Sequence, residues 1–187
     1  YKHLLTAFGQ PEYPLVLSQE YRTASEWGQA YCLYVLGDKE KAAFMVDELL
    51  QPWWYRLPGM GVWHGGRDFF RLNALDIGEK VAEVAIERVL EEPDPESAIY
   101  VISGVADEER RAGLSEAALR HLTQGVEVAR KAPENYPMHA GDKYTEMLEL
   151  LAGKASVEAH LGRFEAALST YEEMLKIGQA LPESVHR

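Results

Sequence analysis

The chain has little cysteine, few basic residues and no long apolar run. A single cysteine, Cys32, excludes an internal disulfide framework and a zinc site built from several cysteines. The 19 basic residues against 30 acidic ones give a net charge of −11, which argues against a nucleic-acid surface and against binding to an anionic membrane. No apolar run approaches the roughly 18 residues that a bilayer-spanning helix needs. We therefore expect an acidic cytoplasmic protein that carries no cofactor.

The length of the chain limits its organisation. At roughly 150 residues per domain, 187 residues predict a single domain, residues 1–187, or one compact set of repeats. The sequence begins at Tyr1 and not at Met, which is consistent with a removed leader or a flanking domain outside it.

Three glycines share a frame in which one alanine lies seven residues before the glycine and another lies five residues after it. The frames are Ala30–Gly37–Ala42, Ala106–Gly113–Ala118 and Ala155–Gly162–Ala167. Apolar residues follow each second alanine at spacings of four and seven or eight, which place them on one helical face. A glycine just past a helix end allows a left-handed backbone without steric cost. Each frame therefore predicts a helix, a tight turn and an antiparallel helix whose small side chains allow close packing.

A weaker fourth unit falls between the first frame and the second. Ala82, Ile86, Val89 and Leu90 repeat the second-helix pattern, but Gly78 is one residue out of frame. The first helix of this unit is expected to be short.

The expected helices and two long connections account for residues 19–180. They are 19–36, 39–51, 67–76, 79–92, 95–110, 114–131, 143–160 and 164–180, with connections near 51–66 and 132–142. Asp94 followed by Pro95 is typical of a helix N-cap with proline at the first helical position. No stretch alternates apolar and polar residues as a strand would, so the expected fold class is all-α.

This pattern resembles the tetratricopeptide repeat. The family's signature positions match best between 151 and 175, at Ala155, Gly162, Arg163, Phe164, Glu165, Ala167, Leu168 and Tyr171. The resemblance covers about two-thirds of the chain, and unequal spacing between units marks it as divergent. It implies antiparallel helix pairs stacked as a short right-handed solenoid of about four repeats, with units near 19–51, 67–92, 95–131 and 143–180.

In such repeats the first helices line a concave groove. The residues expected to face that groove are Trp27, Tyr31, Tyr34, Ser103, Asp107, Arg110 and His160. Aromatic side chains are frequent interface anchors because they bury a large area at a modest rotamer cost. The alternative is that Trp27 and Tyr31 pack beneath the N-terminal segment.

The connection 52–66 holds three of the four tryptophans, Trp53, Trp54 and Trp63, followed by His64. Large exposed apolar patches are uncommon on monomeric proteins, so this segment is expected either to be buried in the core or to be covered when a ligand binds. One interpretation is a lid or docking loop. The other, which the sequence favours, is an internal plug beside the short helix.

The sequence contains no recognisable catalytic motif. His64 and Asp68 are four residues apart, and His121 and His160 lie on neighbouring expected helices, but neither set matches a known metal-ligand spacing. Cys32 lies in an apolar segment, where a free cysteine is usually a small buried hydrophobe.

The function expected from these features is that of a non-enzymatic scaffold or adaptor. It would bind a protein or peptide in the groove, a basic partner being the special case that fits the acidity, and would bind neither nucleic acid nor membranes. One alternative is a small-molecule- or peptide-sensing regulatory domain with the tryptophan-rich segment as its lid. The other is a helical metal-dependent enzyme using His64 and Asp68. The oligomeric state is left open.

Overall fold

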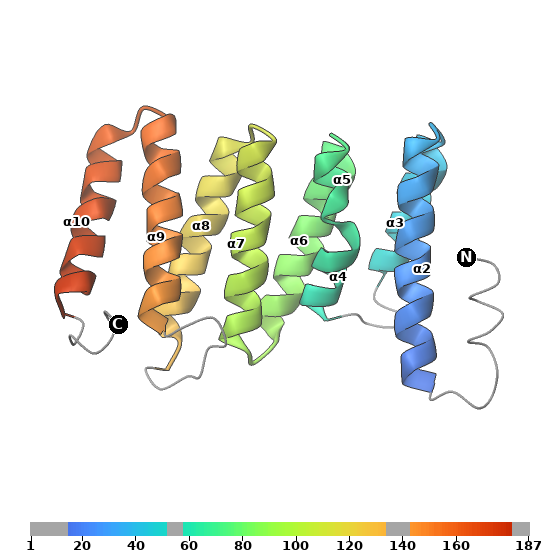
Figure 1. Ribbon diagram of the computed structural model, residues 1–187, viewed down its shortest axis with the longest axis horizontal. Helices are drawn as coiled ribbons and strands as arrows, with labels where there is room; N and C mark the ends of the chain where they lie inside the picture. The colour runs from blue at the N-terminus through green and yellow to red at the C-terminus, as the bar shows by residue number, and fades with distance from the viewer. Residues whose placement is uncertain (1–14, 52–57, 134–142, 181–187) are drawn as a thin grey trace. The chain divides into compact units, whose positions relative to one another are not determined.

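The computed structural model describes residues 15–51, 58–133 and 143–180, with side chains from residue 23 to residue 179 within those ranges. Its helices are α2 (Leu15–Val35), α3 (Lys39–Leu50), α4 (Gly59–Gly66), α5 (Asp68–Arg71), α6 (Leu75–Glu91), α7 (Pro95–Arg111), α8 (Ser115–Lys131), α9 (Lys143–His160) and α10 (Phe164–Ala180) (Figure 1). These ranges contain no strand, and the all-α prediction is confirmed. No helix in them is both long enough and apolar enough to cross a membrane.

The same turn joins three helix pairs, α2/α3, α7/α8 and α9/α10. Gly37, Gly113 and Gly162 have backbone φ angles of 92°, 81° and 76°, in the left-handed region where a glycine is least strained. At the second turn the Gly113 N–H donates to the carbonyl of Arg110 at 3.2 Å, and the Leu114 N–H donates to that of Glu109 at 2.8 Å. Equivalent bonds form at the other two glycines. The predicted turn glycines are therefore confirmed, and each satisfies the last carbonyls of its first helix.

A fourth turn has this geometry with asparagine in the glycine's place. Asn73 has a φ of 57°, and its N–H donates to the Phe70 carbonyl at 3.0 Å. The Ala74 N–H donates to the Phe69 carbonyl at 2.9 Å, as the residue after each turn glycine does elsewhere. The expected helix 67–76 is therefore wrong, because this turn separates α5 from α6. Asparagine is one of the few residues that enter the left-handed region readily.

Centring the frame on Asn73 also changes the role of Gly78. The small residues seven before and five after Asn73 are Gly66 and Gly78, where the other pairs have alanine. Gly78 lies inside α6, and its N–H makes the first helical bond to the Ala74 carbonyl at 2.9 Å. The second pair is thus in register with the others, and its first helix is the broken helix α4–α5. Residues 59–66, which we expected to be part of a connection, form α4.

The frame residues lie where the paired helices meet. None of the six frame alanines is more than 4 % exposed. The helices they belong to pack as α2 on α3, α7 on α8 and α9 on α10. The close packing predicted from the small residues is confirmed at these pairs. Their further arrangement into a right-handed solenoid stays a prediction.

The chain divides into two compact units, Tyr1–Ala85 and Ile86–Arg187, and the division falls inside α6. Each unit is described separately below. In the first, α2 packs on α3 and contacts α4. Its core is apolar and rich in aromatic residues, with Trp27, Val46, Val62, Trp63, Phe69, Phe70 and Val81 among its buried side chains.

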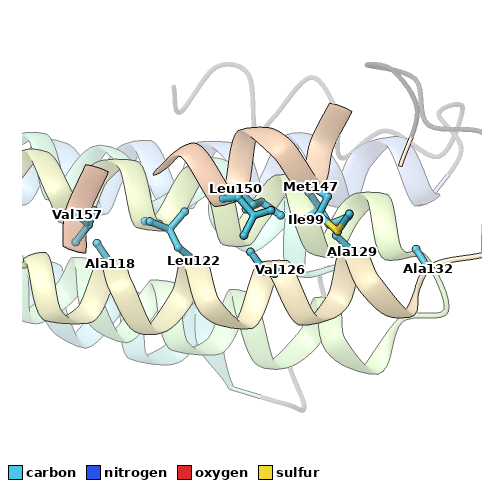
Figure 2. Close-up of a cluster of buried hydrophobic side chains, with 11 residues drawn as sticks. Ile99, Ala118, Leu122, Val126, Ala129, Ala132, Met147, Leu150 and Val157 are labelled. Atoms are coloured by element: carbon cyan, nitrogen blue, oxygen red, sulfur yellow. The ribbon is translucent and has the colours of Figure 1, made fainter. Parts of the chain in front are cut away.

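The second unit is built from α7, α8, α9 and α10, each packed on the next in the sequence. Figure 2 shows one side of α8, with Leu122, Val126 and Ala129, facing Met147 and Leu150 of α9. A β-carbon added to Gly125 of α8 would lie 2.9 Å from Leu150 Cδ2, so this glycine lets α9 come close. Met174 and Ile177 join the same cluster from α10.

Asp94 is the N-cap of α7, as predicted. Its carboxylate accepts hydrogen bonds from the backbone N–H groups of Glu96 at 3.1 Å and Ser97 at 3.3 Å. Pro95 occupies the first helical position, where a missing N–H costs nothing.

Candidate functional site

Trp27 lies in the core of the first unit and not on an exposed surface. Its side chain is 4 % exposed, and the indole packs against the bare backbone of Gly65, where a β-carbon would overlap the ring. The buried indole Nε1 has no hydrogen-bond partner among the described residues. The expectation that Trp27 lines a groove is therefore not met, and this side chain acts in packing α2 against α4.

Tyr31 and Tyr34 form a partly exposed aromatic cluster with Phe69. The Tyr31 and Tyr34 rings meet the buried Phe69 ring edge-on, with centroid distances of 6.3 Å and 6.0 Å. Lys39 Nζ lies 5.1 Å from the centre of the Tyr34 ring, within range of a cation–π interaction. Tyr31 remains 37 % exposed. Phe69 thus supports both tyrosine rings from the core, and part of the Tyr31 side chain remains accessible to solvent.

Apolar exposure continues along α2 beyond this cluster. Val35, one helical turn after Tyr31, and the adjacent Leu36 are both among the exposed large hydrophobic residues. Cys32 is exposed too, so the expectation that it is buried is wrong. It follows Tyr31 on the outer side of α2, whereas Ala30 points into the core. Residues 1–14, under which Tyr31 was alternatively expected to pack, lie outside the described residues.

The expected groove residues of the second unit are polar. Asp107 and Arg110 are exposed on α7 and form an ion pair, with Arg110 Nη2 3.0 Å from Asp107 Oδ1. Ser103 is half-buried on the same helix, and His160 is exposed at the end of α9. The structure therefore brings Asp107 and Arg110 together.

The predicted tryptophan segment is only partly described, since Trp53 and Trp54 lie outside the described residues. Trp63 lies on α4, is 2 % exposed and packs against Phe70 at a centroid distance of 6.3 Å. For this tryptophan the structure agrees with the core plug and not with the lid.

His64 lies on α4, and Asp68 lies at the start of α5. His64 is exposed on α4, and its pKa is lowered by partial burial and by the positive charge of Arg67. Asp68 is paired with Arg71 at 3.1 Å. In the described part of the chain, no three His, Cys, Asp or Glu side chains are grouped so that they could hold a metal ion.

Two polar pairs in the second unit, each with a buried glutamate, were not predicted from the sequence. Glu109 of α7 is 2 % exposed, and its Oε2 lies 2.8 Å from His121 Nδ1 of α8. The Thr170 hydroxyl of α10 donates to Glu158 Oε2 of α9 at 2.8 Å. In both pairs the glutamate lies four residues before the turn glycine and its partner eight residues after it. This common spacing is the sequence signal that could have revealed them.

Lys154 completes the second of these pairs. Its Nζ donates to Glu158 Oε1 at 2.6 Å and to the Thr170 hydroxyl at 2.9 Å. A buried carboxylate is tolerated when an opposite charge and hydrogen bonds replace the lost water. The arrangement therefore fixes α9 against α10.

The face of α10 opposite this core is apolar and exposed. Its large side chains are Phe164, Leu168, Tyr171 and Leu175, between 48 % and 67 % exposed. The third frame predicts an apolar helical face with Tyr171 and Leu175, and Phe164, Leu168 and Tyr171 match family signature positions. The missed signal was that their spacing of four, three and four residues forms one helical stripe.

Glu146 of α9 is held in an unfavourable environment. Partial burial raises its pKa, and the negative charges of Glu149 and Glu96 raise it further. The folded protein therefore holds this proton more tightly than the unfolded chain does, so ionisation of Glu146 lowers stability as the pH rises from about 4 upward.

We expect Glu146→Gln to raise the melting temperature at pH 7 and to leave it nearly unchanged at pH 4. The side chain is only partly buried, so screening keeps the gain at pH 7 to about 1–3 °C. Thermal melts followed by circular dichroism at both pH values check this. A gain of the same size at both pH values would show that the carboxylate's charge is not the cause.

No protein-family model matches the chain, and no curated protein sequence matches it.

Proposed function

We propose that the protein is a non-enzymatic scaffold that binds a peptide or protein segment on the exposed side of its first helices. Its helix pairs would stack as a divergent, tetratricopeptide-like right-handed solenoid of about four repeats in the cytoplasm. The shared turn geometry at Gly37, Asn73, Gly113 and Gly162 supports the repeats, because it joins successive helices in the same way each time.

The observation that carries the proposal is the aromatic cluster of Tyr31, Tyr34 and Phe69. Phe69 is buried and holds both tyrosine rings edge-on, which limits their rotamers before any partner arrives. Tyr31 nevertheless keeps exposed area that a partner can cover. A preorganised tyrosine loses little side-chain entropy on binding, so it is well suited to anchor an interface.

The negative net charge of the chain favours a positively charged partner. The chain carries a net charge of −11, which favours encounter with a basic segment and disfavours an acidic one. The Asp107–Arg110 ion pair is exposed on both sides. Exposed pairs of this kind contribute little affinity but can select register.

We expect Tyr31→Ala to weaken peptide binding at least about tenfold, as loss of an aromatic anchor does. Peptides would first be selected from a displayed library on the wild-type chain, and their affinities then measured by fluorescence anisotropy. The matched control is Phe44→Ala, which removes an exposed aromatic side chain from the second helix α3.

The melting temperatures of the two variants complete this test. Tyr31→Ala should shift the melting temperature no more than Phe44→Ala does. If Tyr31→Ala loses stability in proportion to binding, Tyr31 is a core residue and the proposed surface is wrong.

A further inference from the structure

The exposed stripe of α10 matches a surface that another helix of this chain already covers. The positions that lie 2, 6, 9 and 13 residues after the turn glycine are equivalent in α8 and α10. On α8 these positions are Ser115, Leu119, Leu122 and Val126, and on α10 they are Phe164, Leu168, Tyr171 and Leu175.

On α8 that face is covered by α9. Leu122 and Val126 are buried in the cluster that Leu150 of α9 also joins. A β-carbon on Gly153 of α9 would lie 3.1 Å from Leu122 Cδ2, so the two backbones approach closely here. The same face of α10 is apolar and larger, and nothing described covers it. The exposed stripe of α10 therefore has the helical spacing and the apolar character of a binding surface for an amphipathic helix.

Acidic residues beside the stripe indicate which charge a helix that covers it would carry. Glu116 of α8 accepts a hydrogen bond from Arg163, 2.6 Å away and three residues beyond the end of α9. Glu165 holds the position of Glu116 on α10. Glu165 and Glu172 are both exposed, and neither has an ionic partner in the described ranges, whereas Glu173 is bound by Arg130.

We propose that the stripe of α10 binds an amphipathic α-helix of another protein whose apolar face is flanked by basic residues. Basic side chains would pair with Glu165 and Glu172 as Arg163 pairs with Glu116. A second copy of α10 is the alternative occupant that the test must exclude, because an antiparallel pair centred on the stripe brings Glu165 of one copy as close to Lys176 as to Glu172 of the other. This surface is separate from the tyrosine cluster and does not depend on it.

The test uses the full chain and two synthetic amphipathic peptides of about 20 residues, long enough to be helical when bound. Both peptides carry the same leucine stripe, flanked by lysine and arginine in one and by glutamate in the other. Fluorescence anisotropy should show that the basic peptide binds about tenfold more tightly, as two exposed charge pairs suggest. The double variant Glu165→Lys/Glu172→Lys should reverse this preference.

Leu168→Asp should abolish binding of the basic peptide, whereas Tyr100→Asp on α7 and Tyr31→Ala on α2 should leave it unchanged. Both aspartate variants replace exposed residues, and circular dichroism would verify that they fold. A failure here leaves the tyrosine-cluster proposal standing, since Tyr31→Ala is tested with different peptides.

Several results would overturn the proposal. Binding that survives in Leu168→Asp would place the peptide elsewhere, and no binding of either peptide would remove the site. A wild-type dimer that dissociates in Leu168→Asp, seen by sedimentation, would assign the face to a second copy. Tighter peptide binding after deletion of residues 181–187 would assign it to the chain's own C-terminal segment.

Discussion

Gly66→Ala is expected to lower the free energy of unfolding of the first unit by about 2 kcal/mol. A β-carbon at this position would overlap both methyl groups of Val81, and Val81 is fully buried on α6 and cannot move aside. Overpacking of this kind costs up to about 3 kcal/mol, and the better helix propensity of alanine returns about 1 kcal/mol. Urea titration followed by tryptophan fluorescence reports on this unit, because all four tryptophans lie before residue 64.

Gly178→Ala is the matched control, with an expected change of opposite sign. Gly178 lies in α10, and a β-carbon there meets nothing within 4 Å. The substitution should therefore raise the stability of the second unit by about 0.5–1 kcal/mol, which is the helix-propensity difference alone, and circular dichroism during the urea titration measures it. If both variants were stabilised, the close approach of α4 to α6 would be wrong.

Lys154→Met is expected to destabilise the second unit by about 2–3 kcal/mol. Glu158 is buried, and the substitution leaves its carboxylate with the Thr170 hydroxyl but without its cation. Removing one member of a buried charge pair is costly because the remaining charge cannot be hydrated. Hydrogen exchange of the α9 and α10 amides measures the loss where it occurs.

Two comparisons make this prediction specific. The double variant Lys154→Met/Glu158→Leu should recover most of the loss, because no uncompensated charge remains. Lys80→Met removes a lysine from the exposed ion pair with Asp47 and should change stability by less than about 1 kcal/mol. Equal effects of the two lysine substitutions would show that burial of Glu158 does not matter.

Local backbone chemistry made most of the helices predictable. Gly37, Gly113 and Gly162 mark turns that need a left-handed residue, and alanines at fixed distances mark the helix contacts. Both signals lie within a short stretch of sequence around each turn, so they can be found without knowing the tertiary structure. The bounds of α9 and α10 accordingly match the prediction.

The second pair was misplaced because each of its markers is replaced by another residue. Asn73 makes the turn, and Gly66 and Gly78 take the alanine positions, so no glycine–alanine frame is visible. Four glycines give α4 a poor helix propensity. Its helical state depends on packing of Trp63 and Val62 in the core, which is a tertiary effect.

The candidate surfaces were predictable only in part. The sequence placed Trp27 and Tyr31 on one face of a helix, but it could not show that a bare Gly65 would receive the first and Phe69 support the second. The α10 stripe has a visible helical period, yet the same period on α8 is buried. Exposure was decided by whether a later helix packs there, and helix periodicity does not contain that information.

The hydrogen-bonded pairs four residues before and eight residues after a turn glycine couple mutations across the two hairpins of the second unit. These pairs are Glu109 with His121 and Glu158 with Thr170. Changing one member alone would set a carboxylate against a hydrocarbon. Homologues should therefore show covariation between the two sites, and chimeras should exchange whole hairpins, cut in the long connections, to remain foldable.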